Sequence, residues 1–216
     1  MGKNVRIEKG LVAFFLVLAA LPVFAGSSAT EIVRKAQQKI DRAKSLSADF
    51  STTTQLSVIG KKSTISGRLF VLYGQNKIRL EQPEQTIVSD GKSVWTFAVA
   101  NRQVVVTHAE RDGIGARPDE LLRYADRYIP VLIGQETLDG QVCHVLKLTA
   151  KNPHLSPSEL QVWVDATAFL TRKMAFRDEA GSETVIRFSA IRLDASLPPD
   201  IFRMTVPKDV ELVDLR

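Results

Sequence analysis

The sequence predicts an α+β fold, in which a strongly curved antiparallel sheet forms an open, incomplete β-barrel covered by an N-terminal helix and a short helical insert. One amphipathic helical segment opens the folded part of the chain. About ten segments with a strand-like alternation follow, and the short turns between them favour antiparallel neighbours. A sheet of that width curls under its own twist, and helices that cover one face leave an apolar concavity.

The first 25 residues have the features of a secretory signal peptide. Lys3, Arg6 and Lys9 form a basic leader, an apolar stretch runs from residue 11 to residue 23, and Ala25 ends a cleavage motif. The apolar stretch is shorter than the roughly 20 residues of a membrane span, and an uncleaved anchor is the alternative. We therefore expect a signal peptide at 1–25 and a single domain at 26–216.

The charge and cysteine content exclude several classes of protein. The formal net charge is +5 for the whole sequence and falls to +3 once residues 1–25 are removed. No dense block of lysine or arginine indicates a nucleic-acid partner. Cys143 is the only cysteine, so no internal disulfide forms, and its strand-like surroundings favour a buried structural thiol.

Residues 28–46 are expected to form the helix. Ser28 and Glu31 are spaced as a capping box, and one stripe of the helix is apolar. An ordinary helix lying on a sheet and a helix covering an apolar ligand both fit this stripe. Strands are then expected from residue 48 and near 63–72, 77–82, 86–89, 93–98 and 103–108, with turn signals that include Asp90-Gly91.

The alternation stops between His108 and Gly134. Pro118-Asp119-Glu120 has the character of a helix start, and the apolar run Ile129–Ile133 follows, so one or two short helices are expected there. Strands resume at 135–138, turn at Asp139-Gly140, and continue at 141–150, 159–165, 169–178 and 183–193.

Candidate chemistry is absent from the sequence. The three histidines lie far apart without ligand partners at metal-site spacing, and there is no nucleophile elbow, phosphate loop or dinucleotide motif. We therefore expect no catalytic residue, no metal, no cofactor and no enzymatic activity. A large set of apolar residues remains, and although core packing explains any one of them, together they are typical of a cavity for ligands that lack hydrogen-bonding groups.

Three segments resemble a known family, the LolA-like periplasmic lipoprotein carriers. They are SLSADFSTTTQ after the first helix, the GRLF and SDGKSVWTF segments, and the closing segment IFRMTVPKDVELVD. The resemblance implies an incomplete barrel that holds the acyl chains of a lipoprotein beneath helices. It implies a periplasmic location, acylated lipoproteins as cargo, an inner-membrane ABC transporter and an outer-membrane receptor as partners, no nucleic acid, and a monomer.

The resemblance also implies which residues line the cavity and which close it. Trp95, Phe97 and the strand at 77–82 are the expected liners, and the segment from Leu121 to Leu132 is expected in the lid. Well-studied members use an arginine to hold the lid, but Leu72, Tyr73 and Gly74 occupy those positions here, so Arg68 and Arg79 are the candidates to replace it. The full set of expected liners is Phe50, Phe70, Leu72, Tyr73, Ile78, Leu80, Trp95, Phe97, Leu121, Leu122, Ile129, Leu132, Trp163, Phe176 and Phe188.

Two other functions remain open for the same fold. One is a regulatory module that senses lipid or lipoprotein and signals through a partner protein. The other is a carrier of different lipids, which the missing arginine leaves open.

Overall fold

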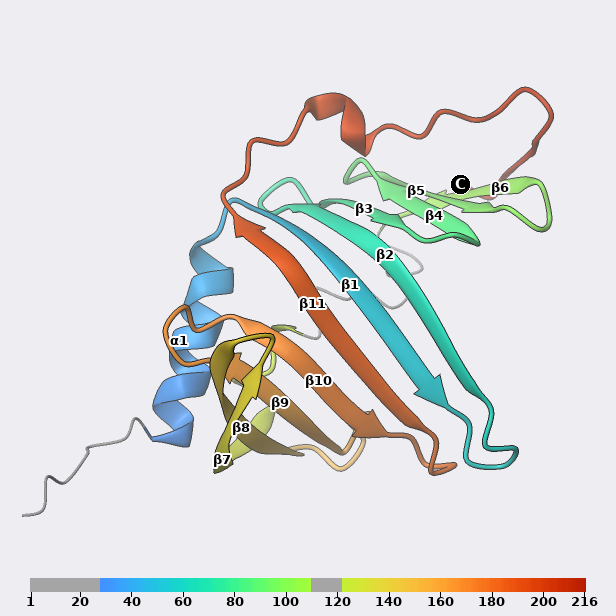
Figure 1. The fold of residues 1–216 in the computed structure, drawn as a ribbon. Coiled ribbons are helices and arrows are strands. Elements are labelled where there is room, and N and C mark those ends of the chain that lie inside the picture. Colours follow the sequence, from blue (N-terminus) through green and yellow to red (C-terminus); the bar gives the residue numbers. More distant parts are fainter. Residues whose placement is uncertain (1–27, 110–121) are drawn as a thin grey trace, which may run out of the picture.

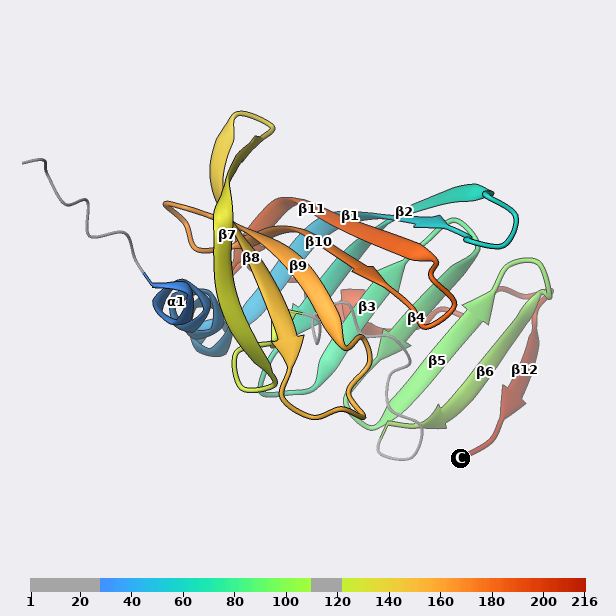
Figure 2. The same ribbon diagram turned by 90° about the horizontal axis from the view of Figure 1, so that it is seen from below.

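The computed structural model describes residues 28–109 and 122–216, and its elements are one α-helix, twelve strands and a short 3-10 helix (Figures 1 and 2). In chain order they are α1 (Ala29–Arg42), β1 (Ser45–Gln55), β2 (Lys62–Leu72), β3 (Lys77–Glu81), β4 (Gln85–Ser89), β5 (Ser93–Ala98), β6 (Gln103–His108), β7 (Tyr128–Leu138), β8 (Gln141–Ala150), β9 (Glu159–Asp165), β10 (Thr171–Arg177), β11 (Glu183–Leu193), η2 (Pro199–Phe202) and β12 (Glu211–Asp214).

Helix α1 begins as the sequence predicts. The Ser28 hydroxyl accepts a hydrogen bond from the Glu31 amide at 3.2 Å, which satisfies one of the free N–H groups of the first turn. The Glu31 carboxylate does not complete the capping box, because it pairs with Arg34 at 2.6 Å and Lys35 at 3.6 Å on the helix surface. The apolar stripe of the helix is buried, as expected.

All twelve strands belong to one sheet, in the order β12-β6-β5-β4-β3-β2-β1-β11-β10-β9-β8-β7. Strands β1 and β11 pair in the middle, so the meander β1–β6 and the meander β7–β11 extend in opposite directions from them (Figure 2). The expected antiparallel sheet is corrected in one place, because the last strand, β12, runs parallel to β6. The class is mostly β rather than α+β, and the sheet is neither closed nor strongly curled.

Strand β7 corrects a second expectation. The apolar run Ile129–Ile133 was expected to be helical, but it pairs in register with β8, with Ile129 opposite Thr149 and Leu132 opposite Leu146. From the sequence alone, an isolated apolar run can be either a strand or a buried helix. Here its pairing with β8 shows that it is a strand. The helix expected from Pro118 lies outside the described residues.

The turns follow their local sequence. Asp139 and Gly140 both have positive φ angles, 49° and 79°, which suits the two-residue hairpin between β7 and β8. At the turn between β4 and β5, the Asp90 carboxylate accepts hydrogen bonds from the Lys92 and Ser93 amides at 2.8 and 2.9 Å.

Alternation along the strands gives the sheet two different faces. The inner face, which packs against α1, carries Leu46, Phe50, Leu69 and Ile78. The outer face carries the residues between them, including Arg68, which pairs directly with Glu81. Among the described residues, no helix has the length and apolar character needed to span a membrane.

Candidate functional site: the apolar interior beneath helix α1

The interior between α1 and the inner face of the sheet is the main apolar region of the described chain. Its helical wall is the stripe Ile32, Val33, Ala36 and Ile40. The sheet contributes buried aliphatic side chains from both halves, namely Leu46, Leu69, Val71, Ile78, Leu80, Ile87, Val94, Leu146, Leu148, Leu160, Val162, Val164, Met174 and Ile186. Such a lining offers apolar contact and few hydrogen bonds, which suits a hydrocarbon ligand.

Two aromatic side chains of this cluster lie side by side on the inner face. Phe50 of β1 and Phe188 of β11 are register partners, and each is 4% exposed. Gly67 of β2 is the partner of Phe50 on its other side. A Cβ atom at Gly67 would lie 2.7 Å from Cζ of Phe50 and would overlap the carbonyl oxygen of Glu81. Glycine at 67 therefore makes room for the Phe50 ring.

Arg123 joins α1 to the sheet at the edge of the interior. Its Nη1 atom donates to Oδ1 of Asp41 in α1 at 2.6 Å, and its guanidinium carbon lies 5.1 Å from the centre of the Tyr73 ring. Gln37 of α1 donates to the same Asp41 carboxylate oxygen at 3.0 Å. Arg123 therefore bridges the helix and the residue that follows β2.

Two buried tyrosines hold the segment that leads into β7. The Tyr124 hydroxyl lies 2.9 Å from that of Thr171, and the Tyr128 hydroxyl donates to the Pro157 carbonyl at 2.9 Å. Burial raises the pKa of Tyr124 to about 12, and it also raises the pKa of Tyr128. Both phenols are therefore neutral at physiological pH and able to donate hydrogen bonds.

The structure brings some of the expected cavity liners together on the inner face. Phe50, Ile78, Leu80, Leu122 and Phe188 belong to the main buried cluster. Tyr73 and Phe176 are partly buried and pack against that cluster.

Other expected liners lie elsewhere. Residues that pair across neighbouring strands point to the same face, and the register Phe70–Arg79–Val88–Trp95 belongs to the outer face. Alternation places Leu72 and Phe97 on that face too. Trp163 lies in a small separate cluster with Leu138, Cys143 and Val145. Ile129 and Leu132 are exposed in β7, and Leu121 lies outside the described residues.

The two arginines expected to hold the lid are also on the outer face. Arg68 and Arg79 both pair with Glu81, each at 2.6 Å. Arg79 Nη1 also donates to the Ile201 carbonyl at 3.2 Å, so it holds the C-terminal segment. Arg123 was not expected in this role, and no local signal could have found it, because 82 residues separate it from Asp41.

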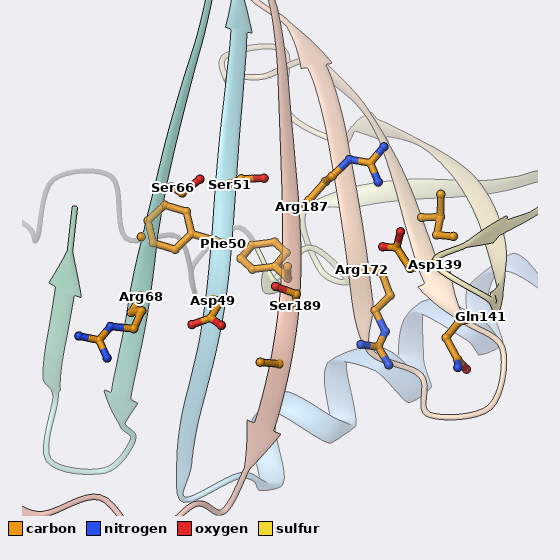
Figure 3. A pocket seen from close by; sticks show the side chains of 14 residues that line it. Asp49, Phe50, Ser51, Ser66, Arg68, Asp139, Gln141, Arg172, Arg187 and Ser189 are labelled. Carbon is orange, nitrogen blue, oxygen red and sulfur yellow. The ribbon is translucent and has the colours of Figure 1, made fainter. Parts of the chain in front are cut away.

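A cavity of about 740 Å³ lies between β1, β2 and β11 and the tip of the β7–β8 hairpin (Figure 3). Figure 3 shows charged side chains around it, including Arg68, Arg172, Arg187, Asp49 and Asp139. Two of these arginines already have carboxylate partners, Glu81 for Arg68 and Asp165 for Arg172. The wall of this cavity therefore combines charged side chains with the Phe50 and Phe188 rings of the main apolar cluster.

No group of three or more histidine, cysteine or acidic side chains that could hold a metal ion occurs within 28–109 and 122–216. The lone thiol of Cys143 is buried, and burial raises its pKa. The thiolate, which is the reactive form of cysteine, is therefore disfavoured at this position.

Comparison with known proteins finds a family that covers most of the chain. Residues 41–205 match the family model described as "Outer membrane lipoprotein carrier protein LolA". An outer-membrane lipoprotein carrier protein of Nitrosomonas europaea is 30% identical over 206 residues, which cover 93% of this chain and 97% of that protein.

Two further relatives match most of this chain but cover different shares of their own length. An uncharacterized protein of Methanocaldococcus jannaschii is 24% identical over 94% of this chain, and the match spans 59% of that longer protein. A crystal structure of an uncharacterized conserved protein from Thermus thermophilus is 14% identical, with a TM-score of 0.57, over 86% of this chain and 98% of that one. The last likeness concerns the fold alone. With the family match over residues 41–205, the chain belongs to the LolA family of outer-membrane lipoprotein carrier proteins.

Proposed function

We propose that this chain is a periplasmic carrier that holds the acyl chains of lipoproteins between α1 and the inner face of the sheet and carries them from the inner to the outer membrane. Membership of the family implies lipoprotein cargo. The observation that supports the role most directly is the aliphatic and aromatic interior, which includes Phe50 and Phe188. A carrier of this kind needs no catalytic group.

The interior is filled in this structure by the side chains of α1. Ile32 is fully buried, and Val33, Ala36 and Ile40 are at most 5% exposed. Moving the helix away exposes these four side chains at a cost of about 5–10 kcal/mol, taking roughly 1.5–3 kcal/mol for each of the three large ones. An acyl chain gains about 0.8 kcal/mol per buried methylene. About ten buried methylenes therefore offset the displacement of the helix.

Because the two free energies are similar, the carrier can alternate between a state without cargo and a state with cargo. Without cargo, α1 covers the apolar inner face, and Arg123 holds it through Asp41 and Tyr73. With cargo, acyl chains replace the contacts of α1. An inner-membrane ABC transporter would supply the energy for loading, and an outer-membrane receptor would accept the cargo.

The test uses inner-membrane vesicles that contain a radiolabelled lipoprotein and the cognate transporter. Added to these vesicles with ATP, the protein should bring the lipoprotein into the soluble fraction as a one-to-one complex. Ala36→Phe places a bulky ring in the space proposed for cargo, and it should lower the yield of complex. The matched control is Arg34→Phe, which adds the same ring to the exposed side of the same helix.

Circular dichroism and thermal unfolding would first show that both variants fold. If the lipoprotein stays with the vesicles, the carrier function is wrong. If Arg34→Phe lowers the yield as much as Ala36→Phe, the cargo does not occupy the space beneath α1.

A further inference from the structure

Strand β7 is an edge of the sheet, and its register with β8 shows which of its backbone groups are paired. The Ala150 amide at the end of β8 donates to the Ser158 carbonyl on the β9 side. Because alternate residues of a strand turn their N–H and C=O groups to opposite sides, the odd-numbered residues of β8 face β7. The β7 residues that pair with them are Ile129, Val131, Gly134, Glu136 and Leu138.

The residues between these turn their backbone groups away from the sheet. The bulge between Leu132 and Gly134 shifts the alternation, so the N–H and C=O groups of Leu132, Gln135 and Thr137 all point outward. Within residues 28–109 and 122–216, no hydrogen bond involves these groups, and the three residues are exposed. Pro130 has no N–H group, which limits the free edge to the part of β7 that follows it. Such a row of donors and acceptors pairs with another extended backbone.

The free edge adjoins the interior beneath α1. Strand β7 contacts α1, and Figure 2 shows the two at the same end of the sheet. The side chain of Leu132 lies on the inner face, because its register partner Leu146 belongs to the main apolar cluster. The free backbone groups of Leu132 therefore lie at the rim of the space proposed for acyl chains.

We propose that β7 pairs with the extended polypeptide segment next to the acylated residue of a bound lipoprotein, so that this segment adds a strand to the sheet. The inference rests on the proposed carrier function, because acyl chains beneath α1 are joined to a polypeptide that must leave the interior at its rim. An isolated strand pair is marginally stable in water, so a free peptide should bind only at concentrations on the order of millimolar. A segment tethered by its bound acyl chains reaches such an effective concentration. Tethering therefore favours the cargo over a free partner or a second copy of this chain.

The test compares two probes by hydrogen exchange of single amides in NMR spectra. One probe is S-dipalmitoylglyceryl cysteine amide, and the other carries a short threonine-rich peptide on the same cysteine. Both should enter the interior and shift the tryptophan emission of Phe188→Trp. Only the second should slow the exchange of Leu132, Gln135 and Thr137, by about twofold or more, since the effective concentration of its peptide is similar to the expected dissociation constant. The amide of Val131, which already pairs with β8, should not change.

Two substitutions at one position separate the backbone from the side chain. Gln135→Pro removes the outward N–H group, whereas Gln135→Ala, the matched control, removes the side chain and keeps the N–H group. After circular dichroism has shown that both variants fold, the proline variant should lose the slowed exchange at Leu132 and Thr137, and the alanine variant should keep it. Equal loss in both variants would overturn the pairing.

The remaining outcomes distinguish this inference from the carrier function. Binding of both probes without slowed exchange refutes the strand pairing alone. Slowed exchange with the acyl probe alone, or in the free protein as its concentration rises, would also overturn the pairing, because α1 or a second copy would then cover the edge. If neither probe binds, the carrier function is wrong, and the inference fails with it.

Discussion

Replacing Arg123 with glutamine should loosen α1 without unfolding the sheet. The arginine forms an ion pair with Asp41 at 2.6 Å, and the two side chains are 36% and 46% exposed. A pair this exposed contributes about 0.2–1 kcal/mol. The contact with the Tyr73 ring, 5.1 Å from the guanidinium carbon, adds about 0.5–1 kcal/mol. Their sum, about 1–2 kcal/mol, corresponds to roughly a five- to thirtyfold shift of a two-state equilibrium.

Hydrogen–deuterium exchange measures this shift directly. In Arg123→Gln, amides of residues 33–40 should exchange roughly tenfold faster than in the native protein, because the helix separates from the sheet more often. Amides of β8 and β9, which lie within the sheet, should keep their protection. In the carrier assay the same variant should load cargo faster, since less free energy opposes opening.

The matched control is Arg34→Gln. Arg34 pairs with Glu31 at 2.6 Å, but that ion pair lies within α1 and does not join the helix to anything else. It should therefore change the exchange of α1 only slightly. Unchanged exchange in Arg123→Gln, or equal acceleration in both variants, would refute the role of Arg123 as the contact that holds the helix.

Three further predictions concern other parts of the structure. Gly67→Ala should lower the free energy of unfolding by about 1–3 kcal/mol or more in a denaturant titration, because the added methyl group meets the Phe50 ring and a backbone carbonyl; an unchanged midpoint would contradict this packing. Burial raises the pKa of Asp165, but hydrogen bonds from two backbone amides and from Arg172 outweigh burial and lower the pKa overall. The ionised carboxylate therefore stabilises the fold at pH values above the unfolded pKa of about 3.9, and this stabilisation is lost as the pH falls below that value. Asp165→Asn should then destabilise the fold by about 1–3 kcal/mol at neutral pH. If the difference in the free energy of unfolding between the native protein and the variant stayed constant down to pH ~3, the lowered pKa of Asp165 would be contradicted. Finally, Phe188→Trp should report acyl ligands by a shift in tryptophan emission, whereas the two native tryptophans, which lie away from the main apolar cluster, should respond little; a full response in the native protein would move the binding site to them.

Local sequence predicts the elements of this fold better than the side of the sheet on which each residue lies. The helix start at Ser28 and the turn at Asp139-Gly140 depend on backbone chemistry within a few residues, and both form as expected. The parallel pairing of β12 with β6 depends on contacts between residues more than 100 positions apart. No periodicity in the sequence reports such a pairing.

The same limit applies to the interior. A strand with apolar residues on both faces, such as β5, does not reveal which set faces the helix. Val94 packs in the main cluster, and Trp95 points the opposite way. The register with β4 and β3 settles the question, because Trp95 pairs with Val88 and Val88 with Arg79. The aromatic content of a strand therefore predicts that its side chains are buried. Only the pairing register shows whether α1 or the C-terminal segment covers them.

The outer face of β3–β6 shows what buries those aromatic residues. Val88, Val104 and Val106 lie on this face and are at most 1% exposed. The C-terminal segment that follows β11 runs past these strands (Figure 1), with Phe202 buried and its neighbouring carbonyl held by Arg79. The chain thus covers one apolar face with its C-terminal segment, and covers the other with α1, which is held by its buried stripe and by the exposed Arg123–Asp41 pair. We propose the inner face as the site for cargo because its cover is a single helix, whereas the segment that passes the outer face is anchored in the sheet by the pairing of β12 with β6.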